Sequence, residues 1–340
     1  MNDMMKIGIL SSGGDCPGIN ATIRGVGKTA IMHYNMEVVG IHCGFSGILN
    51  KDVEVFDERS LSGILNLGGT ILGTSREKNF RKLIVSAEEH SSIIEQRYKE
   101  LGLDCIVCIG GNGTQKTAYM LSEIGLNIIG VPKTIDNDVW GSDITFGFDT
   151  AVNIATEAID RLHSTASSHK RVMVVEVMGH KVGWLALYAG MAGGADVIIL
   201  PELGYDIDKV NEAILDRAQR GKPYSIVVVA EGIQTGSKQR PADYFTKAIE
   251  QATGIETRDT VLGYTQRGGN PSPFDRNLAT RLGGHATELI ANGKFGNMVC
   301  LKGDKVDSIP LAEVAGKLKI VTPAHELIIQ GERMGISFGK

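Results

Sequence analysis

The sequence of 340 residues has little that would direct it to a membrane, to nucleic acid or to an oxidising compartment. It contains no run of about 18 apolar residues, so no membrane span is expected. Residues 1–10 lack the apolar core of a signal peptide. The formal net charge is only −4, which gives no general attraction to polyanions. We therefore expect a cytoplasmic protein with no nucleic-acid or membrane partner.

Cysteine and proline are scarce as well. The cysteines, Cys16, Cys43, Cys105, Cys108 and Cys300, are odd in number and scattered, which favours reduced thiols. Two of them form a CxxC, but inside the apolar run CIVCIGG, so core packing is favoured over a zinc or redox site. Only 9 prolines accompany 43 glycines. This glycine excess indicates tight turns and close backbone approaches and not a disordered chain.

The ordinary nucleotide-binding fingerprints are also absent. No GxxxxGK[ST] motif occurs, and no GxGxxG follows a predicted strand, so a Rossmann dehydrogenase is disfavoured. Instead, short apolar runs alternate with amphipathic stretches of helix length, which predicts an α/β fold with mostly parallel sheets. One helix is expected from residue 149 to residue 170. Strands are expected at residues 6–10, 36–41, 105–109, 127–131, 172–177, 197–200, 225–229 and 259–262.

Two glycine-rich loops each follow a predicted strand and precede a predicted helix. They are residues 11–15 (SSGGD) and residues 110–114 (GGNGT). Glycine lets the backbone approach an oxyanion, and the N–H groups at a helix N-terminus carry partial positive charge. One such loop alone would indicate only a tight turn. Two in the same half of the chain favour phosphate binding.

Two carboxylates, a hydroxyl and an ammonium follow the strand at residues 127–131. They belong to Lys133, Thr134, Asp136 and Asp138 in the segment PKTIDND. Phosphoryl transfer to an alcohol needs a carboxylate to take the hydroxyl proton and cations to offset the charge of the moving group. An Asx-rich turn that caps the next helix is the simpler reading, but this combination of residue types favours the catalytic one.

Scattered arginines supply further candidates for binding phosphate. Arginine suits phosphate because its guanidinium offers a bidentate fork. Arg267 is the strongest, since it precedes two glycines where backbone can close on a ligand. The others are Arg76, Arg171 and Arg258.

Taken together, the motifs of this chain resemble those of the phosphofructokinases. SSGGDCPGINATIRG, GGNGT, PKTIDND, TFGFDTAV, SSHKRVMVVEVMGH, AEG and ETRDTVLGYTQRGGNPSPFDR occur in that family's order, over roughly Lys6 to Leu282. The resemblance implies two Rossmann-like three-layer α/β domains with mostly parallel sheets. The donor-binding domain would comprise residues 1–147 plus about 260–311. The sugar-phosphate-binding domain would comprise residues 148–259 plus about 312–340.

The resemblance also implies a role for individual residues in moving a phosphoryl group from ATP to fructose 6-phosphate. Asp136 would be the general base, with Thr134, Lys133 and Arg76 beside the transferring group. The donor would be bound by Gly14, Arg76, Asn112, Gly113 and Thr114, and Mg²⁺ by Asn112 and Asp138. The sugar phosphate would be bound by Thr134, Asp136, Arg171, Met178, Gly179, His180, Glu231, Arg258, Tyr264 and Arg267. Arg171 and Arg258 would act across a subunit interface, which implies a homo-oligomer, usually a tetramer.

Three positions depart from the family pattern. Asn112 replaces an aspartate that helps to hold magnesium, and an amide oxygen lacks the charge that favours a hard dication. His180 replaces an arginine, and Tyr264 replaces a histidine, both on the sugar side. These departures leave open a kinase of another sugar phosphate, or a weakly active regulatory subunit that binds sugar phosphate. Retention of Asp136 opposes the second of these.

The choice of phosphoryl donor depends on two positions. Pyrophosphate-specific members carry an aspartate where this chain has Gly113, and that carboxylate would repel an ATP phosphate. Lys133 is found in pyrophosphate users and in a mixed subgroup that uses ATP. Because Gly113 removes the obstacle, ATP is the expected donor and pyrophosphate the alternative.

Overall fold

The computed structural model describes residues 4–75, 80, 88–236 and 238–340. It divides into two compact units, each assembled from separate stretches of chain. Unit 1 comprises residues 1–134, 138–149 and 267–318, and unit 2 comprises residues 135–137, 150–266 and 319–340. The assignment of the units to donor and sugar phosphate, and the domain boundaries expected from the sequence, stay predictions. Among the described residues, no helix is both long and apolar enough to cross a bilayer.

Unit 1 is built on a seven-stranded sheet in the order β11-β10-β5-β4-β1-β2-β3. The inner strands pair in parallel, whereas both edge strands pair antiparallel with their neighbours. The strands are β1 (Lys6–Ser12), β2 (Glu37–Ile41), β3 (Val53–Phe56), β4 (Cys105–Gly110), β5 (Ile128–Pro132), β10 (Asn297–Lys302) and β11 (Lys305–Pro310).

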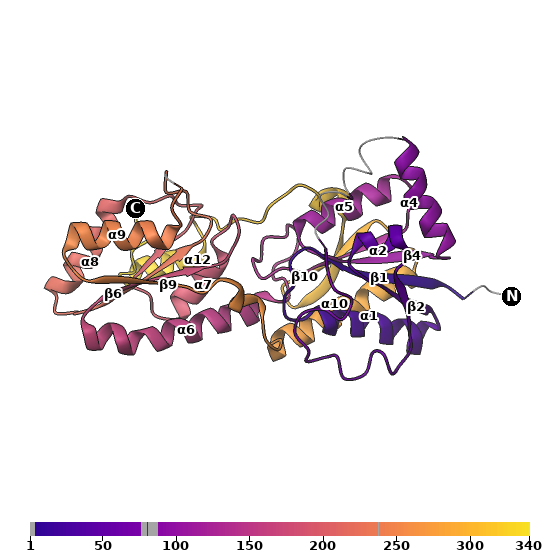
Figure 1. The fold of residues 1–340 in the computed structure, drawn as a ribbon, viewed down its shortest axis with the longest axis horizontal. Coiled ribbons are helices and arrows are strands. Elements are labelled where there is room, and N and C mark those ends of the chain that lie inside the picture. The colour runs from indigo at the N-terminus through magenta and orange to yellow at the C-terminus, as the bar shows by residue number, and fades with distance from the viewer. Residues whose placement is uncertain (1–3, 76–79, 81–87, 237) are drawn as a thin grey trace. The chain divides into compact units, whose positions relative to one another are not determined.

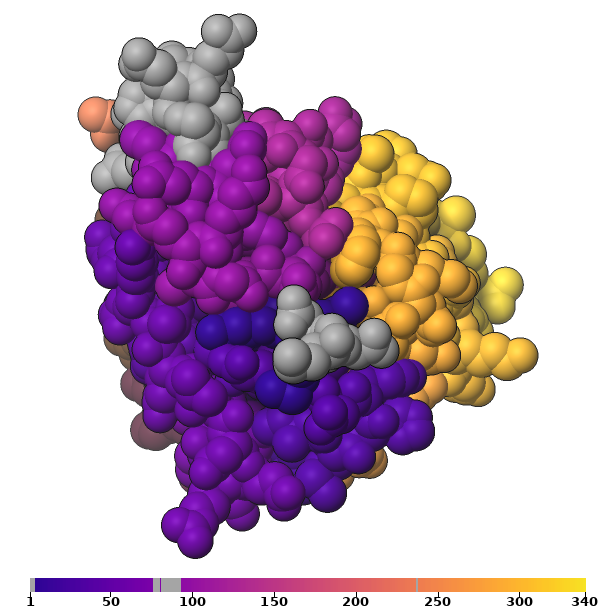
Figure 2. Space-filling model, turned by 90° about the vertical axis from the view of Figure 1, so that its right-hand side faces the viewer, coloured from indigo at the N-terminus to yellow at the C-terminus, as the bar shows by residue number. Residues whose placement is uncertain are grey.

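Helices cover both faces of this sheet (Figure 1). On one face α1 (Ile19–Tyr34) packs against α10 (Pro273–Ala291), and the other face carries α2 (Phe45–Asn50), α4 (Glu88–Glu100) and α5 (Asn112–Glu123). The short helix α11 is Leu311–Val314. Figure 2 shows one face of the molecule, on which orange residues of the 267–318 stretch lie beside the indigo and purple N-terminal segments.

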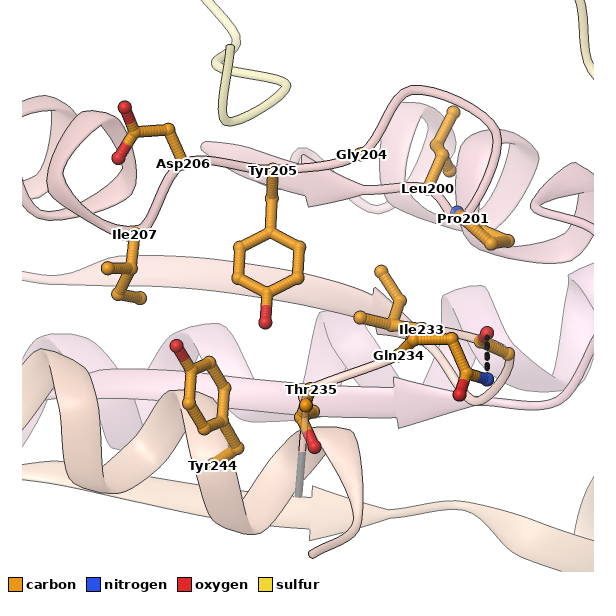
Figure 3. A pocket seen from close by; sticks show the side chains of 12 residues that line it. Leu200, Pro201, Gly204, Tyr205, Asp206, Ile207, Ile233, Gln234, Thr235 and Tyr244 are labelled. Atoms are coloured by element: carbon orange, nitrogen blue, oxygen red, sulfur yellow. Dashed lines mark hydrogen bonds between the residues drawn. The ribbon is translucent and has the colours of Figure 1, made fainter. Parts of the chain in front are cut away.

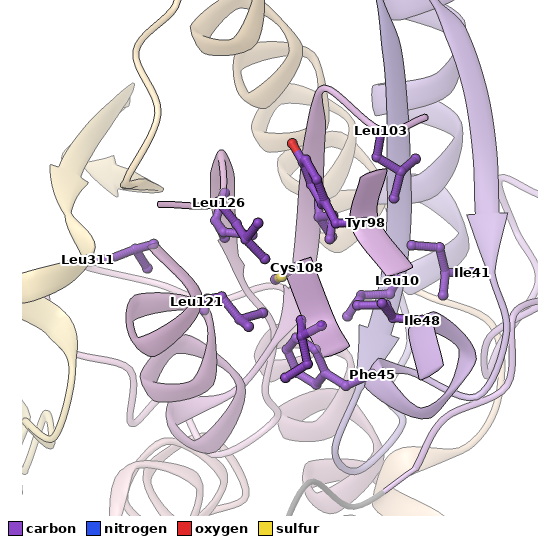
Figure 4. Packing of buried hydrophobic residues seen from close by; sticks show 14 of the residues in the cluster. Leu10, Ile41, Phe45, Ile48, Tyr98, Leu103, Cys108, Leu121, Leu126 and Leu311 are labelled. Carbon is purple, nitrogen blue, oxygen red and sulfur yellow. The ribbon is translucent and has the colours of Figure 1, made fainter. Parts of the chain in front are cut away.

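A buried hydrophobic cluster holds this unit together on the face covered by α2, α4 and α5. Phe45, Tyr98, Leu121 and Leu126 from that layer pack onto strand residues such as Cys108 (Figure 4). Cys105 and Cys108 are both fully buried with free thiols, and burial raises the pKa of Cys105 above its usual range. The interpretation of the CxxC as core packing is therefore confirmed.

Unit 2 is built on a four-stranded, all-parallel sheet in the order β7-β8-β6-β9. The helices α8 and α9 pack together on one face, and α6 lies on the other (Figure 1). The strands are β6 (Val172–Val177), β7 (Val197–Ile199), β8 (Ser225–Ala230) and β9 (Thr257–Val261). The helical elements are α6 (Phe148–His169), α7 (Trp184–Ala192), α8 (Ile207–Gln219), α9 (Pro241–Thr253), α12 (Glu326–Arg333) and the 3₁₀ helix η1 (Gly263–Arg267).

Candidate active site

Three motifs predicted from the sequence meet at one edge of the sheet of unit 1. In the order β5-β4-β1, Ser12 pairs with Gly110 and Gly110 pairs with Pro132. The loops that follow these three positions therefore leave the sheet side by side at its carboxyl edge. This edge is where open α/β sheets bind ligands.

The loop after β1 is held in place by backbone and side-chain hydrogen bonds. Gly13 has φ +86°, a conformation that glycine adopts without strain. Its N–H donates to the carbonyl of Ser75 at 3.1 Å, and its carbonyl accepts from Thr74 Oγ1 at 2.6 Å. The loop is thus tied to the segment just before Arg76. Arg76, predicted to be catalytic and donor-binding, lies outside the described residues.

Two cationic side chains converge on Gly14 in this loop. Lys133 is only 4% exposed, and its ammonium donates to the carbonyl of Gly14. A Cβ added at Gly14 would lie 2.7 Å from Nη1 of Arg267. Arg267, expected among the sugar contacts, thus lies against the glycine loop of unit 1. An anion in a chain of net negative charge needs such local cations.

The N-terminus of α5 faces the same edge of the sheet. Gly111 is the N-cap and provides no side-chain cap, so N–H groups of the first turn, which includes Asn112 and Gly113, lack an intrahelical partner. Thr114 Oγ1 donates to the carbonyl of Ser12 at 3.3 Å, which joins this turn to β1. The helix end therefore presents donors of the kind that bind phosphate.

Asn112 and Asp138, the predicted magnesium ligands, contact each other. Nδ2 of Asn112 donates to the backbone carbonyl of Asp138 at 3.2 Å, and Oδ1 of Asn112 is buried without a hydrogen bond from any described residue. Asp138 is 5% exposed. Within the described ranges, no cluster of three His, Cys, Asp or Glu side chains could hold a metal. The pair fits Mg²⁺ only as a partial ligand set, because this ion usually takes one or two carboxylates together with substrate phosphates and water.

The turn from Thr134 to Asp138 leaves one of its two aspartates partly exposed. Thr134 is 8% exposed, and its carbonyl accepts from Thr145 Oγ1 at 2.8 Å. Asn137 is 2% exposed and has φ +53°. Asp136 is half-buried, unlike its buried neighbours. Of the two aspartates in the motif, Asp136 is therefore the more exposed, although its Oδ1 is buried.

In unit 2, the residues that follow β6 and β8 lock one another in place. The N–H of His180 donates to Oε1 of Glu231 at 2.7 Å. A Cβ added at Gly179 would lie 2.5 Å from the carbonyl of Val182, and one at Gly232 would lie 2.4 Å from the carbonyl of His180. Gly179 also has φ +146°. Gly232 therefore lets the two loops approach closely, and Gly179 lets the loop after β6 turn back on itself.

A buried glutamine, Gln266, joins this edge to the turn η1. Its Oε1 accepts from the N–H of Met178 at 3.3 Å, and its Nε2 donates to the carbonyl of Gly263 at 3.0 Å. It is fully buried, whereas Tyr264 in the same turn is 74% exposed. Gln266 is not among the site residues expected from the sequence. Its only signal was its place inside the motif TQRGG, since an uncharged amide has no distinctive chemistry.

Arg171 and Arg258 lie at the amino ends of the strands of the same sheet, opposite to the carboxyl ends described above. Arg171 precedes β6, and Arg258 pairs with Met173 near the start of that strand. Six residues of β6 at ~3.3 Å each put about 20 Å between this edge and Met178. Glu256 bridges the two guanidinium groups, with N–O distances of 2.7 Å to Arg171 and 2.5 Å to Arg258. Unit 2 therefore does not bring these arginines together with its other predicted sugar contacts.

A hollow of about 700 Å³ lies beyond the ends of β7 and β8 (Figure 3). Tyr205 and Tyr244 both line it, and their rings make an edge contact with centroids 6.0 Å apart. Its lining includes the carboxylate of Asp206 and, within the described residues, no lysine, arginine or histidine. The chemistry of this lining does not suit a phosphate group.

The chain is similar to phosphofructokinases in sequence and in structure. A family model described as "Phosphofructokinase" matches residues 6–290. ATP-dependent 6-phosphofructokinase 3 of Bacteroides thetaiotaomicron is 69% identical, over 98% of this chain and 100% of that protein. ATP-dependent 6-phosphofructokinase of Spirochaeta thermophila is 54% identical, over 98% of this chain and 97% of that protein.

Solved structures are similar over most of the chain. Phosphofructokinase of Saccharomyces cerevisiae matches with a TM-score of 0.83 and 31% identity, over 91% of this chain and 45% of that longer one. A pyrophosphate-dependent phosphofructokinase of Nitrosospira multiformis matches with a TM-score of 0.85 over 98% of this chain and 92% of that one. It is 22% identical, so the likeness concerns the fold alone. The predicted fold class is confirmed.

Proposed function

Because the chain belongs to the phosphofructokinase family, we propose that it transfers the γ-phosphoryl group of ATP to the 1-hydroxyl of fructose 6-phosphate. The observation that carries this proposal is the meeting of three loops at one edge of the unit 1 sheet, with Lys133 and Arg267 beside Gly14. The same proposal places the enzyme in glycolysis, in the cytoplasm.

The glycine loop and the start of α5 are proposed to bind the donor phosphates. Their backbone N–H groups, together with Lys133 and Arg267, offset the negative charge of a triphosphate. Bound Mg²⁺ would add charge stabilisation for the phosphates, with oxygen ligands from Asn112 and Asp138. The predicted donor contacts Gly14, Gly113 and Thr114 all belong to these two loops.

Asp136 is proposed as the general base. It takes the proton from the 1-hydroxyl as that oxygen forms a bond to the γ-phosphorus. The bond between the γ-phosphorus and the β,γ-bridging oxygen breaks at the same time, which releases ADP. Thr134, two residues earlier, is proposed to lie beside the moving phosphoryl group. The turn supports this assignment, because Asp136 is the more exposed of its two aspartates.

The sugar phosphate is proposed to bind unit 2 at the ends of β6 and β8. Met178, Gly179, His180, Glu231 and Tyr264 belong to the loops held together there. His180 and Tyr264 depart from the family pattern, so fructose 6-phosphate is tested against other sugar phosphates below. Arg171 and Arg258, at the far edge, are proposed to serve the site of a neighbouring subunit in a homo-oligomer.

The proposal is tested by a coupled assay of the purified protein with ATP or pyrophosphate over several sugar phosphates. We expect turnover with ATP and fructose 6-phosphate and little with pyrophosphate. Asp136→Asn should lower kcat by about 100-fold or more, since proton transfer contributes 10²–10⁴. Unchanged turnover in Asp136→Asn would remove the assignment of the base.

The donor preference is tested by Gly113→Asp. The added carboxylate should repel an ATP phosphate and raise the ratio of pyrophosphate to ATP turnover. Wild-type protein that runs faster on pyrophosphate would show that Lys133 outweighs Gly113. Binding of sugar phosphate without any turnover on either donor would favour a regulatory subunit.

A further inference from the structure

The segment Lys319–Val321 is held within unit 2 by two side chains. Nε1 of Trp184 donates to the carbonyl of Lys319 at 2.9 Å, and Oε1 of Glu202 accepts from the N–H of Val321 at 3.0 Å. The same carboxylate oxygen accepts from the N–H of Gly183, at the start of α7. These contacts fix the backbone that directly follows the Lys319 side chain. The segment lies outside residues 6–290, to which the family model extends.

The side chain of Lys319 reaches back to the motif that contains the proposed base. Its ammonium donates to Oδ1 of Asn137 at 2.7 Å and lies 5.3 Å from the ring centroid of Trp184. A cation over an indole face is attracted by the ring quadrupole. Lys319 is half-buried, and Trp184 is 8% exposed. Packing against the indole therefore restricts the directions in which the ammonium can point.

Asn137 is the residue through which this contact reaches Asp136. It is 2% exposed and has φ +53°, the left-handed region that asparagine tolerates better than most residues. Asp136 and Asn137 share a peptide group, so a change of φ at Asn137 is one way in which this peptide and the backbone of Asp136 can rotate. That rotation would turn the Asp136 carboxylate. Holding the Asn137 side chain therefore restrains the backbone from which the Asp136 carboxylate extends.

We propose that Lys319 is a positioning residue that aligns Asp136 by holding the carboxamide of Asn137. The inference rests on the proposed role of Asp136 as general base. A displacement of about 1 Å in a reacting group can cost about 100-fold in rate. The contact thus assigns a part in the phosphoryl transfer to the C-terminal stretch of the chain.

The test uses Lys319→Met in the full-length protein, with ATP and fructose 6-phosphate as substrates. We expect kcat to fall by about 10- to 100-fold, with KM for both substrates within about twofold of wild type. Lys319→Arg keeps a cation for the Trp184 face and a donor for Asn137, so it should recover most of the rate. The matched control is Lys317→Met. Lys317 is exposed, and its ammonium lies 5.7 Å from the Trp140 ring, so kcat should not change.

The Lys319→Met substitution made in Asp136→Asn protein separates a positioning role of Lys319 from a direct role in binding or catalysis. In Asp136→Asn protein, adding Lys319→Met should lower the residual rate no further, because the group that it aligns is already gone. An equal fold-loss in both backgrounds would overturn the proposal, as would wild-type kcat in Lys319→Met. A raised KM for the sugar phosphate with unchanged kcat would make Lys319 a substrate contact instead. A failure of Asp136→Asn to lower kcat would overturn the proposed base itself, independently of Lys319.

Trp184→Phe provides a variant that does not alter Lys319. It keeps an aromatic face but removes the Nε1–H that holds the Lys319 carbonyl. We expect a smaller fall in kcat with the same unchanged KM values, and the thermal midpoint of each variant monitors folding. If Lys319→Met protein is insoluble and Trp184→Phe has wild-type kcat, the proposal is contradicted.

Discussion

Asn112 has two polar ends in different situations. Its amide nitrogen donates to the Asp138 carbonyl, whereas its buried Oδ1 receives no hydrogen bond from the described residues. A buried acceptor without a donor is costly, so a ligand that meets this oxygen gains the energy of relieving it. A magnesium ion is such a ligand, although an amide attracts it less strongly than a carboxylate does.

Asn112→Asp is therefore expected to lower the magnesium concentration that gives half-maximal rate with ATP, and to raise kcat. The new carboxylate adds charge to the metal shell and also lies at the positive end of α5. Magnesium titrations of initial rate for both proteins measure the midpoint. An unchanged midpoint would mean that Asn112 does not contact the metal.

At the residue scale, the sequence could predict side chains with distinctive chemistry but not their supports. Lys133 and Asp136 are recognisable from residue type and spacing in one short motif. Gln266 and Lys319 are not, because each acquires its role from a distant partner. Lys319 and Asn137 are 182 positions apart. No local pattern reports such a pair.

At the element scale, burial decides which strands could be predicted. β6 was predicted with its observed bounds, because all six of its residues are buried and form a continuous apolar run apart from Glu176. The expected strand 36–41 differs from β2 by one residue at its start, and 259–262 differs from β9 by two residues at the start and one at the end. β3, β10 and β11 were missed. β3 and β11 are antiparallel edge strands with exposed residues, so they lack the apolar run that marks a strand of a parallel sheet.

The contact between α1 and α10 depends on glycine. A Cβ added at Gly283 would lie 2.7 Å from the carbonyl of Thr22 and 2.9 Å from the N–H nitrogen of Val26. Both are backbone atoms of α1, so only a shift of the helix could make room. Alanine here gains about 1 kcal/mol in helix propensity, but overpacking a tight contact costs about 1–3 kcal/mol.

Gly283→Ala is accordingly expected to lower the free energy of unfolding, whereas Gly284→Ala should leave it unchanged or raise it. A Cβ at Gly284 would meet only Thr29 Oγ1, at an ordinary 3.6 Å. Urea denaturation of the two variants and of wild type provides the comparison. Equal stabilities for both variants would contradict a close contact between these helices.

At the scale of the whole molecule, the two ends of the unit 2 sheet divide the predicted sugar contacts. Met178 and Glu231 lie at the carboxyl edge, and Arg171 and Arg258 lie at the amino edge. One small ligand cannot reach both the carboxyl ends and the amino ends of the strands of one sheet. The arginines are therefore predicted to complete a site on another subunit.

Mixing Arg258→Ala protein with Asp136→Asn protein is expected to restore part of the activity that each lacks alone. A hybrid interface can pair an intact base from one chain with an intact arginine from the other. The control is a mixture in which one chain carries both substitutions and the other carries Asp136→Asn. Mixed oligomers that are verified by mass and show no recovery would contradict a shared site.

The division of the chain among the two units also constrains how the protein is made. The polypeptide passes from one unit to the other after residues 134, 137, 149, 266 and 318. In unit 1, β10 supplies the partner of β5 from a stretch that begins at Asn297, and unit 2 needs residues 319–340. The ribosome therefore has to add Asn297 before the sheet of unit 1 can gain β10, and residues 319–340 before unit 2 can be complete. Until then the apolar strands β1, β4 and β5 are exposed and prone to aggregate. The yield of folded protein in cells should therefore depend on chaperones more than that of a protein with contiguous domains.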